Sequence, residues 1–104
     1  MKIQVNTDNN ITASDELRAS YITLISEELK RFDEHITRLE VHLADENSHK
    51  DGMNDKRCMI EARIIGKQPI AVTNQANTLE QAVTGAIDKL KTSLDTIIGR
   101  SRNY

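Results

Sequence analysis

The sequence predicts an α+β protein with two layers, in which a four-stranded sheet carries two roughly parallel helices on one face. Two observations predict this fold. Four segments alternate apolar and polar residues as strands do, and two longer segments repeat apolar residues every three or four positions as helices do. The segments follow in the order β-α-β-β-β-α, and because each strand has one polar face, both helices must cover the other, apolar face.

Length and composition set the limits of this prediction. A chain of 104 residues forms one domain, which we expect to span residues 1–98 and to be followed by a short basic tail at 99–104. Aromatic residues make up only 3%, so the core is aliphatic and few rings are available for stacking nucleic-acid bases. The formal net charge of −2 means that any nucleic-acid contact must depend on a local basic patch.

The first half of the chain supplies two strands and one helix. Residues 2–7 alternate as a half-buried strand does, with Ile3 and Val5 on one side. The first helix begins after Ser14, a good N-cap residue followed by two acids, and its apolar pattern continues to Phe32. Residues 38–44 form the second strand, with three apolar side chains pointing inward: Leu39, Val41 and Leu43.

The second half supplies two more strands and the clearest helix. A polar loop at 45–55 leads to a strand at 56–65, and a short turn at 66–69 leads to the last strand at 70–74. The second helix runs from Thr78 to Ile98. Thr78 and Gln81 have the spacing of a capping box, in which each side chain satisfies a backbone N–H of the first turn.

The residue types that carry catalytic or metal chemistry do not combine into a recognisable site. The three histidines, His35, His42 and His49, fall in a connector, a strand and a loop, and we expect solvated side chains and no metal site. Cys58 lies on the apolar face of its strand, where a free cysteine behaves as a small buried hydrophobe. No phosphate loop or nucleophile motif is present. We therefore expect neither an enzyme nor a cofactor nor a small-molecule substrate.

The start of the chain has no apolar signal segment, and no apolar run is long enough to span a membrane. With the lone cysteine, this favours a reduced, cytoplasmic protein. The remaining candidates for a function are basic residues on the two helices and the tail. Taken singly, each is typical of a solvated helix face, but together they could contact phosphates. The candidate RNA-binding residues are Lys89, Lys91, Arg18, Lys30, Arg31 and Arg100.

Parts of the second helix resemble the ribosome hibernation promoting factor family, also called ribosome-associated inhibitor A or protein Y. The similar residues are Ala82-Val83 and the run from Gly85 through Asp88-Lys89-Leu90, followed by Leu94. The first half agrees through an initial Ile-x-Val strand and the helix end at 29–32. The resemblance implies the short form of the family, with the same β-α-β-β-β-α order.

The resemblance also implies a function. It suggests a translation inhibitor that binds the small ribosomal subunit and its 16S ribosomal RNA in the channel for messenger and transfer RNA, acting by occupancy during stress. Lys89 matches a basic position of the family, and Arg18 lies at a commonly basic one. Where the family often has further basic residues, this chain has four others: Leu24, Glu27, Thr92 and Thr96. The alternative is a protein-interaction module of the same fold that has lost RNA binding.

Overall fold

The computed structural model describes residues 1–46 and 55–101, except for the side chains of residues 100 and 101. The loop predicted at 45–55 therefore lies mostly outside the described residues. The observed elements are β1 (Lys2–Thr7), α1 (Asp15–Glu28), the short 3₁₀ helix η1 (Lys30–Phe32), β2 (Ile36–Asp45), β3 (Lys56–Ile64), β4 (Ile70–Ala76) and α2 (Leu79–Ser101). This is the predicted β-α-β-β-β-α order.

The four strands form one sheet in the order β1-β2-β3-β4. β1 is parallel to β2, and α1 provides the crossover that a parallel pair requires. The other two pairs are antiparallel, so the sheet is mixed. β2 begins two residues earlier than predicted, because Ile36 pairs with Ile64 beyond an irregularity in the ladder.

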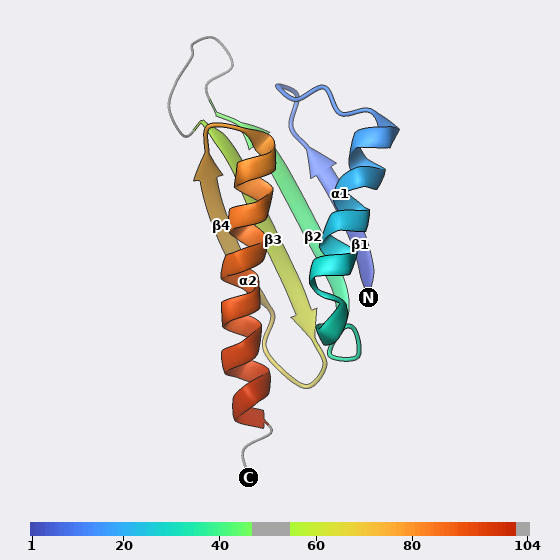
Figure 1. The fold of residues 1–104 in the computed structure, drawn as a ribbon, viewed down its shortest axis with the longest axis vertical. Coiled ribbons are helices and arrows are strands. Elements are labelled where there is room, and N and C mark those ends of the chain that lie inside the picture. The colour runs from blue at the N-terminus through green and yellow to red at the C-terminus, as the bar shows by residue number, and fades with distance from the viewer. Residues whose placement is uncertain (47–54, 102–104) are drawn as a thin grey trace.

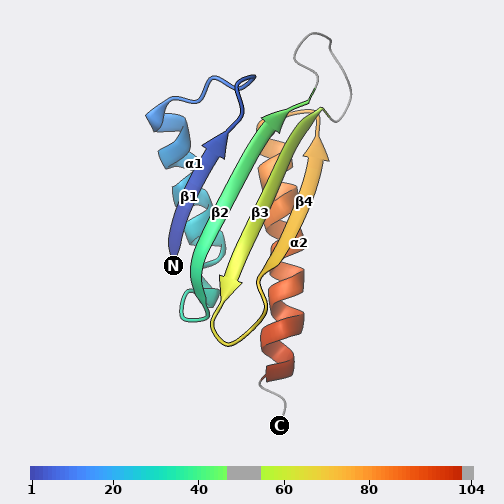
Figure 2. The ribbon, with the colours of Figure 1, turned by 180° about the vertical axis from the view of Figure 1, so that it is seen from behind.

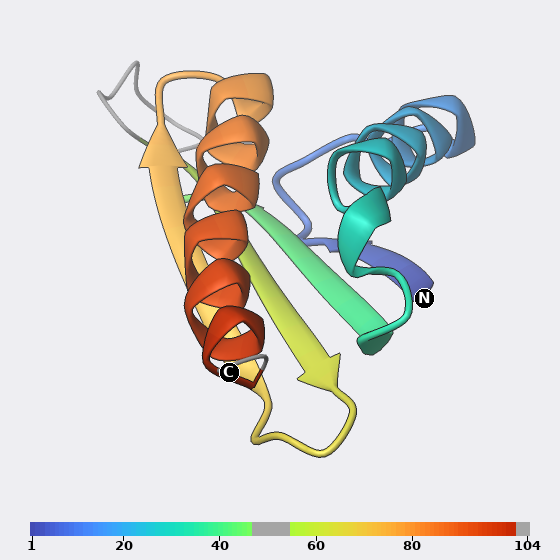
Figure 3. The same ribbon diagram turned by 60° about the horizontal axis from the view of Figure 1, so that its bottom comes forward.

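Both helices lie on the same face of the sheet, as predicted (Figures 1 and 3). α1 covers the side of β1, whereas α2 covers β3 and β4. The two helices run in the same direction, from the top of Figure 1 downward. The opposite face of the sheet carries no helix, as the view from behind shows (Figure 2). The molecule therefore has a helical face and an open sheet face.

The core lies between the two layers and is aliphatic. The inward residues of β2 and β3 are buried, and their outward neighbours remain partly exposed, as the period-two pattern predicts. Four side chains from the helices have no exposed surface and pack against this face of the sheet: Ile25, Leu29, Leu90 and Leu94. Each buried side chain of this size is worth about 1.5–3 kcal/mol of transfer free energy, so the layers are held together mainly by apolar burial.

Both helices start where the sequence predicts, but both end elsewhere. Of the capping box at Thr78 and Gln81, the described residues show only the bond to the Thr78 hydroxyl. The Ser14 hydroxyl accepts the Leu17 N–H at 3.0 Å, and the Thr78 hydroxyl accepts the Gln81 N–H at 3.1 Å. α1 ends at Glu28 rather than at Phe32. The chain then tightens into η1, in which the Phe32 N–H donates to the carbonyl of Leu29, three residues back.

α2 continues past its predicted end at Ile98, through Gly99 to Ser101. A glycine just past the last helical residue commonly adopts the left-handed conformation that ends a helix. Among the described glycines, only Gly66, in the turn between β3 and β4, has a positive φ, of 72°. Gly99 stays helical, and it therefore extends α2 by one turn.

The close approach of α2 to β4 explains why residue 85 is a glycine. The Asn74 side chain points from β4 under the helix and donates to the carbonyls of Gln81 and Ala82, at 3.3 Å each. A Cβ added at Gly85 would collide with the Asn74 amide group. Gly85 is thus needed for α2 to lie this close to β4.

We predict that Gly85→Ala destabilises the protein although alanine is the better helix former. The new methyl group must displace Asn74 and break its two hydrogen bonds. Such overpacking costs about 1–3 kcal/mol, and the two lost hydrogen bonds cost about 0.5–1.5 kcal/mol each. Together these costs exceed the gain of about 1 kcal/mol from replacing a helical glycine. Chemical denaturation of both proteins measures the difference.

Two matched variants test the cause. Gly99→Ala should stabilise the protein, because nothing lies within 4 Å of the added Cβ. In an Asn74→Ala background the collision is gone, so Gly85→Ala should become neutral or stabilising. An equal loss of stability on Gly85→Ala with and without Asn74 would contradict this account.

Candidate nucleic-acid interface

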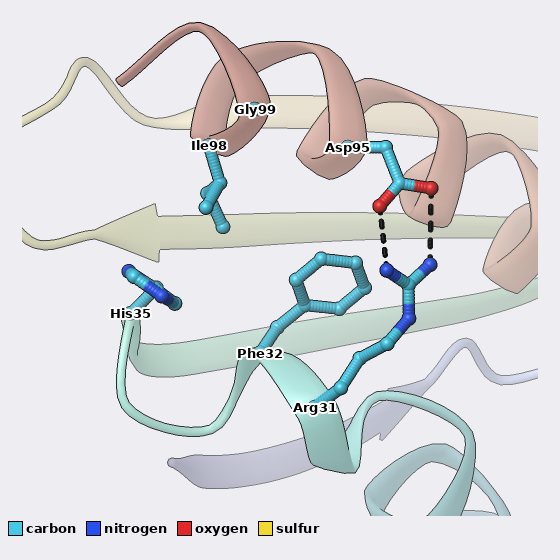
Figure 4. A pocket seen from close by; sticks show the side chains of 6 residues that line it. All are labelled: Arg31, Phe32, His35, Asp95, Ile98 and Gly99. Atoms are coloured by element: carbon cyan, nitrogen blue, oxygen red, sulfur yellow. Dashed lines mark hydrogen bonds and ion pairs between the residues drawn. The ribbon is translucent and has the colours of Figure 1, made fainter. Parts of the chain in front are cut away.

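Four charged side chains face one another across the line where α1 and η1 meet α2. Lys91 Nζ lies 2.6 Å from Glu28 Oε1. The Arg31 guanidinium group donates two hydrogen bonds to the Asp95 carboxylate, from Nη1 to Oδ1 at 2.6 Å and from Nη2 to Oδ2 at 3.0 Å (Figure 4). We call Glu28, Arg31, Lys91 and Asp95 the helix seam.

The positions of these four residues follow from the helical pattern. Leu90 and Leu94 point into the core, so the residues that follow them, Lys91 and Asp95, lie on the flank of α2 that faces α1. Glu28 is likewise next to a buried leucine, Leu29, and it lies on the flank of α1 that faces α2. Arg31 comes from η1 and lies over the Phe32 ring, with its guanidinium carbon 4.1 Å from the ring centre.

The seam is electrostatically balanced. The hydrogen-bonded Arg31 is the main cause that lowers the pKa of Asp95, and the charges of Arg31 and Lys91 lower it further. Two basic and two acidic side chains cancel, so the seam as it stands offers no net charge to a polyanion. Because Arg31 and Asp95 are each more than half exposed, solvent screens this pair strongly.

A small cavity lies beside the Arg31–Asp95 pair, with a volume of about 160 Å³ (Figure 4). Its lining consists of Arg31, Phe32, His35, Asp95, Ile98 and Gly99. Pockets that bind small molecules usually measure about 300–1,000 Å³. The cavity is thus below the ordinary size for a substrate, and its charged groups already pair with each other.

Cys58 lies in the core of β3 with no exposed surface, as its place in the strand pattern predicts. Burial raises the pKa of its thiol to about 12. The reactive form of a cysteine is the thiolate, which this environment disfavours at neutral pH. Cys58 is therefore a packing residue.

The structure brings together only two of the predicted RNA-binding residues, Arg31 and Lys91. Lys89 lies on the other flank of α2, where its Nζ donates to the Thr73 carbonyl of β4 at 2.8 Å. Arg18 lies near the start of α1, with Nη2 3.4 Å from the Thr7 hydroxyl of β1. The Lys30 side chain is exposed and forms no hydrogen bond or ion pair with the residues that the structure describes. The side chain of Arg100 lies outside the described part.

The four positions where the family often has basic residues are neutral or acidic here. Leu24 packs partly against the core, whereas Glu27 is exposed. Thr92 and Thr96 bond back to their own helix, with hydroxyls 3.2 and 3.1 Å from the carbonyls of Asp88 and Thr92. None of these four positions therefore adds a positive charge to the helical face.

The acidic members of the seam, Glu28 and Asp95, were not singled out from the sequence. The sequence alone could have placed each acid on the flank of its helix, because each is next to a buried leucine. A basic residue lies on the same flank. What the sequence did not supply was the relative placement of the two helices, which pairs each acid with a base on the other helix.

The fold and the seam define a small two-layer α+β domain with paired, charged helices. The chain belongs to the family described as sigma 54 modulation protein / S30EA ribosomal protein, whose model matches residues 3–102. This family consists of ribosome-associated proteins and is not an enzyme family. No curated protein matches the chain. None of the helices in the described residues is long and apolar enough to cross a membrane.

Among the solved structures that share the fold, two illustrate the likeness. The N-terminal domain of protein Y from Thermus thermophilus is 22% identical, with a TM-score of 0.72, and the match covers 93% of this chain and 99% of that one. A ribosomal subunit interface protein from Coxiella burnetii is 18% identical, with a TM-score of 0.70, covering 95% and 99%. At this level of identity the likeness establishes the fold alone.

We predict an ordered response of the Asp95 pKa to removal of the seam cations. Arg31→Gln should raise it most, because Arg31 supplies both a hydrogen bond and a charge, and Lys91→Gln should raise it less. Since the folded pKa is lowered, the pair stabilises the fold above the unfolded pKa, and this contribution is lost as the pH falls through the folded value. NMR titration of the side-chain carboxyl carbon measures the shifts. A larger shift for Lys91→Gln than for Arg31→Gln would contradict the geometry.

Proposed function

We propose that the chain binds the small ribosomal subunit through 16S ribosomal RNA and inhibits translation by occupying the channel for messenger and transfer RNA. No catalytic step is involved. The observation that carries this proposal is the family model, which spans nearly the whole chain, at residues 3–102. The structural neighbours, a protein Y domain and a ribosomal subunit interface protein, support the same partner.

In this proposal the phosphate contacts come from the helical face of the molecule. Lys30 and Lys89 are exposed, and their flexible ammonium groups can reach a backbone phosphate. Arg31 already holds a carboxylate with two parallel hydrogen bonds, and the same guanidinium fork fits a phosphate. Arg31 and Lys91 would then exchange their acidic partners for RNA, and Arg18 and Arg100 would add contacts at the two ends.

A specific observation favours a second candidate, a protein-interaction module of the same fold. Among the described side chains of α1, η1 and α2, acidic groups outnumber basic ones by seven to five. A surface of this kind repels a polyanion unless the acids are displaced or neutralised. In this candidate the seam ion pairs tie the helices together and a protein takes the place of the RNA.

We predict that Lys89→Glu weakens co-sedimentation with 30S subunits, whereas Lys67→Glu does not. Both substitutions change the net charge equally, but Lys67 lies in the turn between β3 and β4, away from the proposed contacts. Binding should also fall as salt rises, and Lys89→Gln should lower the slope of log affinity against log salt by about 1. Equal effects of the Lys89 and Lys67 reversals would refute the assigned contact.

Asp95→Asn separates the two candidates. It removes one acid of the seam and releases Arg31, so RNA binding should tighten under the first candidate. Under the second, 30S binding is absent or unchanged. A competition assay with transfer RNA on the 30S subunit then tests the proposed channel, because a protein bound elsewhere would not be displaced.

A further inference from the structure

One face of the sheet carries no helix (Figure 2). Three side chains of the kinds that can bind a metal ion lie close together on this open face. Glu40 and His42 project from β2, and Glu61 projects from β3. One donor atom from each of these residues lies within 4.8 Å of the other two. None of the three belongs to the helix seam or to the proposed RNA contacts.

The ladder between β2 and β3 fixes this arrangement. Glu40 pairs directly with Glu61, and His42 pairs with Met59, two positions along each strand. Because side chains alternate between the faces, all three project from the same outer face. The donors thus come from two paired strands in the middle of the sheet, which hold their backbone positions more firmly than loops do.

The imidazole of His42 supplies an independent indication. Its Nε2 atom is shielded from solvent although the ring is partly exposed, and it has no hydrogen-bond partner among the described residues. It lies 3.5 Å from Oε1 of Glu61, beyond the distance of a good hydrogen bond. A shielded polar atom without a partner is uncommon in folded proteins. A metal ion between the imidazole and the carboxylates would satisfy it.

Arg38 provides the kind of outer support that metal ligands usually have. Its Nη2 and Nε lie 3.1 and 3.2 Å from Oε1 of Glu40, and it also donates to the Gln4 side chain. The second oxygen of the Glu40 carboxylate then remains for a ligand bond. Such second-layer partners orient the ligating carboxylate.

We propose that Glu40, His42 and Glu61 bind one zinc ion, with water completing the coordination. A tetrahedral zinc ion with bonds of about 2.1 Å places its ligand atoms about 3.4 Å apart. The His42 Nε2 and Glu61 Oε1 atoms, at 3.5 Å, already have about this spacing. A rotation of the half-buried Glu40 side chain, whose donor atom lies within 4.8 Å of the other two, would complete the set. An imidazole nitrogen favours zinc over magnesium and calcium, which prefer oxygen ligands only.

The test is a calorimetric titration of the full-length, tag-free protein with zinc chloride after treatment with a chelator. We expect one zinc ion per chain and at least a tenfold loss of affinity in His42→Ala and in Glu61→Gln. Glu34→Gln is the matched control, because it removes an exposed carboxylate outside the group and should bind zinc as the wild type does. Magnesium in place of zinc should give no signal.

A second set of measurements distinguishes the loss of a zinc ligand from unfolding of the variant. In the wild type, zinc should shift the NMR signals of the His42 ring, while thermal melts establish that His42→Ala and Glu61→Gln remain folded. No zinc binding by the wild type, or unchanged affinity in both variants, overturns the proposal. Loss of binding only in His49→Ala, which lies outside the described residues, overturns it as well.

Discussion

The structure depends on the burial of one face of the sheet, since every other feature is placed relative to it. Apolar side chains alternate along the strands, and the sheet cannot leave this face in water. Two helices cover it, and their own apolar stripes fix how far each is rotated about its axis. The buried pairs Leu90–Leu94 and Ile25–Leu29 therefore decide which charged residues lie on the flanks.

The helix seam is a consequence of this rotation. Once Leu90 and Leu94 point into the core, Lys91 and Asp95 must face α1, and the acid and base of the opposite helix lie within reach. The resulting pairs are exposed and contribute little to folding. Their main effect is on recognition, because both basic groups of the seam, Arg31 and Lys91, are already paired with an acid. The same burial that forms the core thus sets the charge available on the helical face.

The sequence predicted the order of the elements, both helix starts and the buried face of each strand, because these depend on short-range periodicity and capping. It predicted the helix ends less well. The 3₁₀ closure at η1 depends on packing Phe32 into the core, and Gly99 continues the helix although its residue type is typical of a helix end. Local pattern does not determine either outcome.

The candidate sites could be predicted only in part for the same reason. The basic residues were visible in the sequence, but Lys89 and Lys91, two positions apart, face opposite neighbours, and only the packed helices reveal this. The even spacing of the three histidines did not predict which of them has carboxylate neighbours. His42 gains its two carboxylate neighbours from the pairing of Glu40 with Glu61 across strands, which depends on a register that no single segment encodes.

The two faces of the molecule also differ in how they can respond to a ligand. On the helical face, a phosphate that approaches Arg31 must displace Asp95, whose carboxylate would remain nearby as a like charge. Part of the attraction gained by the arginine would then be lost to repulsion, so under the proposed function this face would bind RNA only where other cations compensate. Lys30 and Lys89 are free of that constraint, because neither is paired with an acid among the described residues. Affinity for RNA should therefore come first from the flanks of the helix pair and only secondarily from the seam between them.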